Sequence, residues 1–154
     1  MTEESILLKA SEGRPIHGGS GLVKATGAQT GGGYALRELF MPVGRAIPRH
    51  VHAREAEAWY VIEGELTFSL DGAQFVAGPA SFVHLPIGVP HGVRNSSADV
   101  TRFIQIFSPA GLERYFDERE LLERFGEPGR DYAGQTHDEH LALANKYGLT
   151  FLDD

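Results

Sequence analysis

Short runs of alternating hydrophobic and polar residues, separated by glycine and proline, fill residues 30–108. Successive side chains of a β-strand point to opposite faces, so such runs predict half-buried strands. Turn signals recur about every eight to twelve residues, which favours an antiparallel sandwich or small barrel. Asp71-Gly72 is a strong hairpin signal. The predicted strands are Tyr34–Met41, Trp59–Ile62, Glu65–Leu70, Gln74–Ala77, Ser81–Leu85, His91–Asn95 and Val100–Phe107.

The pattern becomes helical after Pro109. Apolar residues at near-helical spacing predict one or two amphipathic helices that end at Gly126. A shorter helix is predicted to begin at a capping box, Thr136 and Glu139, and to end at Gly148. Because the helical part is too small to hold its own core, we predict one domain over residues 1–154. It consists of a β core at about 30–108 and a helical appendage at about 109–148.

Composition and charge narrow the functional class. The 154 residues carry a net charge of −7, and no segment is both basic and aromatic, so no nucleic-acid partner is expected. There is no cysteine, which excludes thiolate catalysis and disulfides. No apolar run approaches the roughly 18 residues of a membrane span, so no membrane partner is expected. The acidic N-terminal segment is unlike a signal peptide, and the expected location is the cytoplasm.

Three histidines and one glutamate form the most informative pattern. His50 and His52 lie two apart in a strand-forming run, so both point to the same face, about 7 Å apart along the strand. Glu57 follows one short turn later, and His91 comes from a distant segment. One H-x-H among seven histidines is unremarkable, but the joint pattern predicts a metal site formed by His50, His52, Glu57 and His91.

The ligand types indicate one divalent transition metal: Fe, Ni, Mn, Co, Cu or Zn. Three neutral imidazoles and one carboxylate leave a divalent ion with a net charge of about +1. A six-coordinate ion would keep two open positions, which can hold a substrate oxygen and dioxygen, or a bidentate enediolate. The residual charge would favour an anionic or enolate ligand.

The motif Gly44-x5-His50-x-His52-x4-Glu57-x6-Gly64 resembles the first conserved motif of the cupin superfamily. Pro86-x-Gly88-x2-His91-x3-Asn95 resembles the second motif, except that Ala80 stands where the family usually has glycine. The resemblance implies a double-stranded β-helix, the cupin or jelly-roll barrel, with the metal inside. The wider sequence is similar to short, single-domain quercetinase-like cupins. In that group the glutamate also acts as a base toward a flavonol hydroxyl, which implies a catalytic role for Glu57.

The sequence is compatible with three functions. The leading hypothesis is a metal-dependent dioxygenase acting on a small flavonol-like, phenolic or enolisable substrate, with Glu57 accepting the substrate proton. The alternatives are a non-oxidative isomerase, lyase or dehydratase on the same barrel, and a non-catalytic cupin that binds a small molecule.

Four further residues are predicted to line the substrate pocket. Trp59 shares the facing of Glu57, although it can equally belong to the barrel core. Phe40 lies on the preceding strand, on the same face as Glu38, and Gln105 could orient a ligand or a bound water. His84 would be a pocket acid or base if its face points inward, and a surface residue otherwise.

Apolar residues on both faces of the predicted strands leave surface to bury beyond the barrel interior. Leu36 with Leu39 and Phe103 with Ile104 are examples. A two-fold homodimer is therefore expected.

Overall fold

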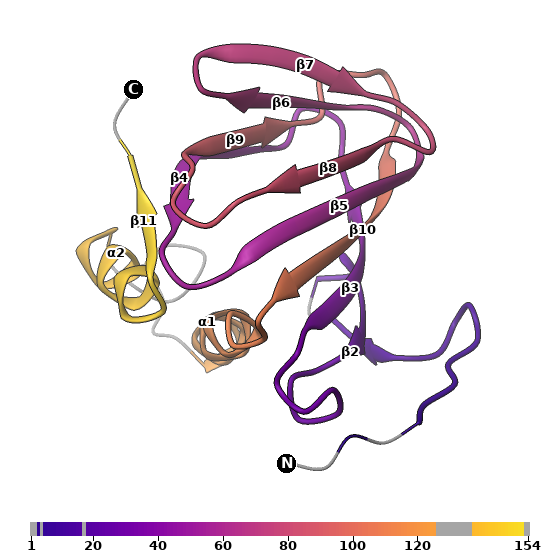
Figure 1. The fold of residues 1–154 in the computed structure, drawn as a ribbon, viewed down its shortest axis with the longest axis vertical. Coiled ribbons are helices and arrows are strands. Elements are labelled where there is room, and N and C mark those ends of the chain that lie inside the picture. The colour runs from indigo at the N-terminus through magenta and orange to yellow at the C-terminus, as the bar shows by residue number, and fades with distance from the viewer. Residues whose placement is uncertain (1–2, 4, 17, 126–136, 153–154) are drawn as a thin grey trace.

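Two antiparallel sheets face each other and enclose the interior of the molecule (Figure 1). The computed structural model describes residues 3, 5–16, 18–125 and 137–152. The predicted mainly β fold with short helices near the C-terminus is confirmed.

The larger sheet has six strands in the order β1-β2-β3-β10-β5-β8. Their bounds are β1 Arg14–Pro15, β2 Gly21–Ala25, β3 Ala35–Met41, β10 Thr101–Ser108, β5 Ala56–Glu63 and β8 Phe82–Leu85. The smaller sheet has the order β11-β4-β9-β6-β7. Its strands are β11 Leu149–Phe151, β4 Ala46–His52, β9 His91–Arg94, β6 Leu66–Leu70 and β7 Ala73–Ala77.

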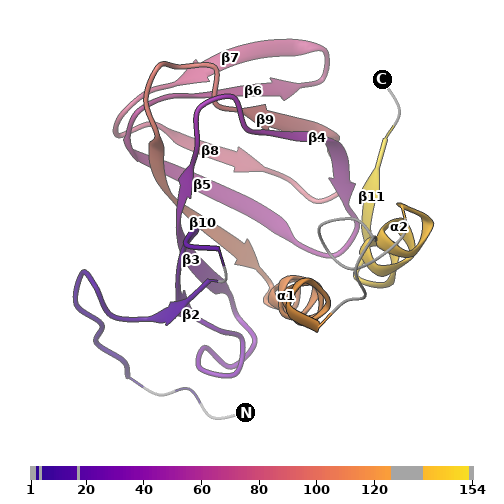
Figure 2. The same cartoon turned by 180° about the vertical axis from the view of Figure 1, so that it is seen from behind.

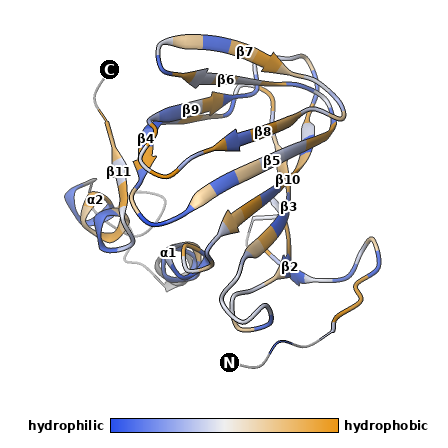
Figure 3. Cartoon of the chain, in the orientation of Figure 1, coloured by the Kyte–Doolittle hydropathy of each residue, from blue (hydrophilic) through white to orange (hydrophobic). Residues whose placement is uncertain are grey.

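The main core lies between the two sheets. Hydrophobic and hydrophilic residues share the strands of both sheets (Figure 3). Inward-facing side chains from the two sheets meet in one cluster. Trp59 stacks on Phe103 with ring centroids 4.6 Å apart. The buried members are Met41, Trp59, Val61, Leu66, Phe68, Ala77, Val83, Leu85, Val93 and Phe103.

The helices α1 (Glu113–Phe125) and α2 (His137–Lys146) lie with β11 at one end of the barrel in both views (Figures 1 and 2). They share a second core with the ends of β3 and β10, made of Ala35, Phe107, Leu112, Tyr115, Leu143, Ala144 and Leu149. The predicted helix end at Gly126 and the capping residue Thr136 lie outside the described residues. Within the described ranges, no helix is long and apolar enough to cross a membrane.

Three strands were not predicted from the sequence. β1 and β2 extend the larger sheet before residue 30 by pairing with each other and with β3. β11 follows Gly148 and pairs with β4, so that Phe151 is the cross-strand partner of His50. All three are at most five residues long and lack a clear alternating pattern, which explains why periodicity did not reveal them.

The outer face of the larger sheet carries apolar side chains. Tyr60 pairs with both Phe82 and Ile104 across the strands. Tyr60 and Phe82 are 44% and 65% exposed. This surface is suited to a two-fold contact with a second copy, and the homodimer stays a prediction.

Two turns explain glycine positions of the motifs. Gly64 has φ +85°, and a Cβ there would lie 2.8 Å from the Cα of Thr101, so the turn after β5 accepts only glycine. Ala80 has φ +64° in a turn closed by the Ser81 N–H donating to the Gly78 carbonyl. A type II turn requires positive φ at this third position, where glycine is favoured. The alanine is therefore strained.

We predict that Ala80→Gly raises the free energy of unfolding by about 1 kcal/mol, because glycine avoids the left-handed penalty. Chemical denaturation of the two proteins measures this difference. Gly72→Ala is a matched control: Gly72 has φ +80° and open space around it, so the change should destabilise by a similar amount. A less stable Ala80→Gly variant would contradict this account of the turn.

Candidate metal centre and cavity

β4 places His50 and His52 on the inner face of the smaller sheet, where both are buried. The pairing of β4 with β9 shifts register between Ile47 and His50, and such a bulge bends a strand. The bend lets two imidazoles on one strand approach the same point, with ring centroids 4.9 Å apart.

His91 and Glu57 reach the same point from two other strands. His91 begins β9 and is the direct cross-strand partner of His50, with ring centroids 4.4 Å apart. Glu57 lies on β5 in the opposite sheet. One ligand atom from each of the four residues lies within 4.8 Å of all the others, and all four side chains are buried. The predicted quartet therefore forms one cluster between the sheets.

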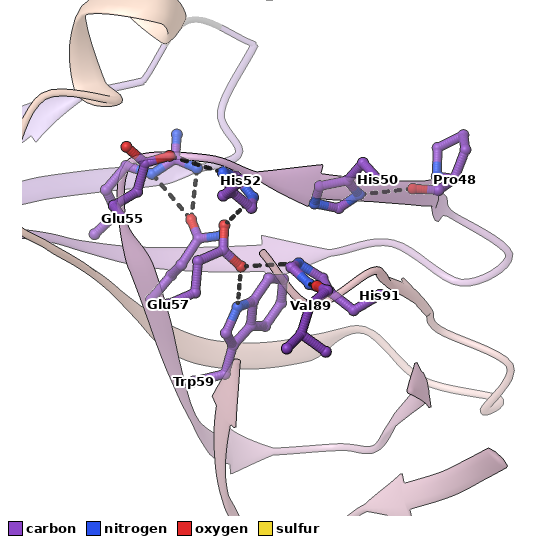
Figure 4. Close-up of polar contacts among 10 residues, drawn as sticks. Pro48, His50, His52, Glu55, Glu57, Trp59, Val89 and His91 are labelled. Carbon is purple, nitrogen blue, oxygen red and sulfur yellow. Dashed lines mark hydrogen bonds and ion pairs between the residues drawn. The ribbon is translucent and has the colours of Figure 1, made fainter. Parts of the chain in front are cut away.

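Hydrogen bonds fix the orientation of each imidazole (Figure 4). His50 Nδ1 lies 2.7 Å from the Pro48 carbonyl, and His91 Nδ1 lies 3.0 Å from the Val89 carbonyl. His52 Nδ1 lies 2.9 Å from Glu55 Oε1. Because these partners accept hydrogen bonds, each Nδ1 carries a proton and donates it. Every neutral ring therefore presents the lone pair of Nε2, as metal-binding histidines do.

The Nε2 atoms of His52 and His91 are fully buried and have no hydrogen bond within the described part of the chain. They lie 2.9 and 3.5 Å from the carboxylate oxygens of Glu57. Native proteins rarely leave buried polar atoms without a partner. Ring nitrogens and a carboxylate that converge on one buried point form a donor set that a divalent cation satisfies, so the residues fit a bound metal.

Burial and charge act in opposite directions on Glu57. Burial alone would raise the pKa of its carboxyl, but contacts with His52 and His91 outweigh burial and lower the pKa. Burial also lowers the pKa of His50 to about 4. At neutral pH Glu57 is therefore ionised and His50 is neutral, as metal binding requires.

His52 behaves differently because it lies between two carboxylates. Burial would lower its pKa, but the hydrogen bond to Glu55 and the contact with Glu57 raise the pKa to about 9. In the metal-free protein His52 therefore holds a proton at neutral pH. A metal ion must displace this proton in order to bind.

A cavity of about 770 Å³ opens beside the quartet. Three predicted pocket residues line it: Trp59 and Gln105 are buried there, and Phe40 borders it with a 42% exposed side chain. Trp59 Nε1–H donates to Glu57 Oε2 over 2.9 Å. Other lining residues include His50, His52, Glu57, Leu39, Met41, Ile47, Phe103, Phe116 and Phe151.

The prediction that His84 lines the pocket is wrong. Its side chain is exposed on the outer face of β8, and it is absent from the cavity wall. Val83 and Leu85 are the inward residues of this strand. Phe82 shares the outward facing of His84, so an apolar neighbour was no sign of burial.

Two site residues were missed in the sequence. Glu55 is 4% exposed, although it lies in the turn before β5, where carboxylates are usually solvated. The one signal was its spacing of three residues from His52. Arg37 is 7% exposed and lines the cavity. Arg37 shares a strand face with Ala35, Leu39 and Met41. The other face of β3 also carries apolar residues, so the sequence did not show which of the two faces points inward.

Comparison with known proteins agrees with the fold and the site. Residues 37–107 match the model of the cupin domain family, and the chain contains a cupin domain. This region includes all four residues of the quartet.

Quercetin 2,3-dioxygenase of Bacillus subtilis is 29% identical over 112 residues, which are 71% of this chain and 33% of the dioxygenase. An uncharacterized protein of Methanocaldococcus jannaschii is 30% identical over 61 residues, which are 40% of this chain and 49% of that protein. The chain thus spans a third to a half of these relatives.

Two solved structures share the fold. An uncharacterized Klebsiella pneumoniae protein with a double-stranded β-helix domain has a TM-score of 0.56 at 22% identity, covering 70% of this chain and 93% of that chain. KdgF from Halomonas sp. has a TM-score of 0.54 at 20% identity, covering 61% and 81%.

We predict that Glu55→Gln weakens metal binding about 10- to 100-fold, because the ring of His52 loses the carboxylate that orients it. Competition with a chelating indicator measures the dissociation constant for Zn²⁺ or Co²⁺. Glu63→Gln makes the same chemical change at an exposed position of β5 and should leave the affinity unchanged. Equal affinities of the two variants would show that Glu55 does not support His52.

We predict opposite pH dependences for metal affinity and metal-free stability. Because binding displaces the proton of His52, the apparent affinity should rise about tenfold per pH unit up to about pH 9. In the metal-free protein the raised pKa means that the proton stabilises the fold fully below about pH 6.5, and this contribution is lost as the pH rises through 9. Indicator titrations and thermal melts after chelation, across pH 6–9, test both slopes. Parallel slopes would contradict the assignment.

Proposed function

We propose that the protein is a metal-dependent enzyme that acts as a dioxygenase on a small flavonol-like, phenolic or enolisable substrate. The observation that carries this proposal is the buried quartet of His50, His52, Glu57 and His91 beside a cavity. The similarity to the Bacillus dioxygenase supports the choice of reaction. The whole activity stays a proposal, because the chain spans only 33% of that enzyme.

The four residues of the quartet would hold the metal. A divalent transition metal, when bound, would supply Lewis acidity toward a substrate hydroxyl and redox chemistry toward dioxygen. His50, His52 and His91 supply neutral donors on a scaffold of Nδ1 hydrogen bonds. This scaffold holds the ligands in place before the substrate arrives.

Glu57 would also accept the substrate proton. Its lowered pKa keeps the carboxylate ionised but makes it a weak base. A weak base is effective when the substrate hydroxyl is already acidic, as in phenols and enols. Trp59 donates to Oε2, and His52 Nε2 lies 2.9 Å from Oε1, so both oxygens of the carboxylate are held in place.

The cavity wall suits a small, flat ligand with polar groups at its ends. Trp59 and Phe103 form a stacked aromatic wall, and Leu39, Met41 and Ile47 add aliphatic surface. Apolar walls with a few polar groups are usual for small-molecule sites.

A non-oxidative isomerase, lyase or dehydratase would use the same metal ligands. Such reactions commonly need a second group to move a proton, and His84 was the sequence candidate. Its exposed position removes it from the cavity. His84 therefore lends no support to this alternative.

The test is oxygen uptake by the reconstituted protein. Elemental analysis identifies the metal in the protein as purified. A chelator then removes this metal, and the metal-free protein is reloaded with Fe²⁺, Mn²⁺, Co²⁺, Ni²⁺, Cu²⁺ or Zn²⁺. We predict that at least one metal supports consumption of one dioxygen per substrate from a panel of flavonols, β-diketones and phenols. Glu57→Gln should lower kcat at least about 100-fold, as expected for loss of a base and ligand.

Glu63→Gln serves as the control and should retain full activity. Equal substrate turnover with and without dioxygen would replace the dioxygenase by a non-oxidative enzyme. Tight binding of a panel compound without turnover under any metal would instead favour a non-catalytic binding protein.

A further inference from the structure

Arg37 is a buried cation that forms no ion pair with any carboxylate of the described residues. It projects from β3 into the cavity beside the quartet and is 7% exposed. Its Nε and Nη2 both donate to Gln105 Oε1, over 3.2 and 2.6 Å. Across the described residues, no carboxylate forms an ion pair with it and Nη1 has no hydrogen bond partner. Burying a charge against a neutral amide alone is unfavourable.

Neighbouring carboxylates are engaged elsewhere. Asp117 pairs with Arg14 over 2.8 Å, and Glu120 lies 3.9 Å from the same guanidinium. Glu113 accepts hydrogen bonds from the backbone N–H groups of Gly27 and Gly111. Glu57 acts on Arg37 only at longer range, and a bound divalent ion would neutralise its charge. Metal binding therefore leaves Arg37 still less compensated.

The guanidinium is held in a fixed plane. Gln105 fixes one edge, and the ring of Phe116 lies under it with the Arg37 Cζ 3.7 Å from the ring centroid. A planar fork with one edge free matches the two oxygens of a carboxylate. Backbone pairing places Arg37, Gln105 and Trp59 in one row across β3, β10 and β5. Two strand spacings, about 10 Å, separate the ends of this row.

We infer that the substrate carries a carboxylate, which binds Arg37 while the metal-chelating end of the substrate lies at the quartet. This inference rests on the proposed function and names its substrate class: small aromatic or enolisable acids, rather than neutral flavonols. Arg37 is a binding residue in this scheme and moves no proton.

The test compares two ligands that differ only in this group. The probes are 3,4-dihydroxybenzoate and its methyl ester, which share the same chelating catechol. Each is titrated calorimetrically into the Co²⁺-loaded protein under nitrogen, so that no oxidative turnover occurs. We predict that the wild type binds the acid about 10- to 100-fold more tightly than the ester. Arg37→Met should bring this ratio near one, and Arg37→Lys should give an intermediate ratio.

Arg45→Met is the matched control, because Arg45 also borders the cavity but is exposed; it should keep the wild-type ratio. The ratio of the acid and ester affinities is measured separately for each variant, and thermal melts verify that each variant is folded. If Arg37→Met does not fold, the affinity ratio of Arg37→Lys tests the inference. A wild-type ratio near one, a ratio unchanged by either Arg37 substitution, or no binding of the acid would overturn the inference. Failure to bind Co²⁺, read from its visible absorption, would instead overturn the proposed function on which the inference rests.

Discussion

The burial of Glu57 among three imidazoles is the constraint on which the rest of the site depends. A carboxylate between two sheets is unfavourable unless positive charge or hydrogen bonds compensate it. In the metal-free protein the proton on His52 and the indole N–H of Trp59 provide this compensation. A metal ion would replace the proton. The two sheets are thus joined by an interaction that either a proton or a metal can complete.

This constraint also organises the surroundings of the quartet. Glu55 accepts a hydrogen bond from Nδ1 of His52, and Nε2 of the same ring lies beside Glu57. The two carboxylates therefore fix the orientation of the His52 ring. His50 and His91 donate to backbone carbonyls instead. Burial lowers the pKa of His50, so its ring is neutral at neutral pH. In the metal-free protein the His52 ring therefore carries a second proton, whereas the His50 ring presents a free Nε2 lone pair.

Sequence reasoning predicted the barrel and the quartet because both depend on strict spacing. The two-residue interval of His50 and His52 fixes their common face, and the intervals to Gly64 and from Pro86 to His91 identify the fold. The facing of His84 was not predictable, because Phe82 and Val83 make both faces of β8 apolar. Arg37 and Glu55 were missed for another reason: charged residues are seldom buried, and their burial depends on partners from other elements.

β11 forms the edge of the smaller sheet next to β4. β4 carries two of the quartet histidines, and β11 pairs along its outer side from Leu149 to Phe151. Leu152 N–H also donates to the Arg49 carbonyl. Without these residues, β4 would be an edge strand whose free backbone groups could pair with another chain. The last strand therefore protects the histidine-bearing strand from intermolecular strand exchange, and ties the C-terminal segment to the integrity of the quartet.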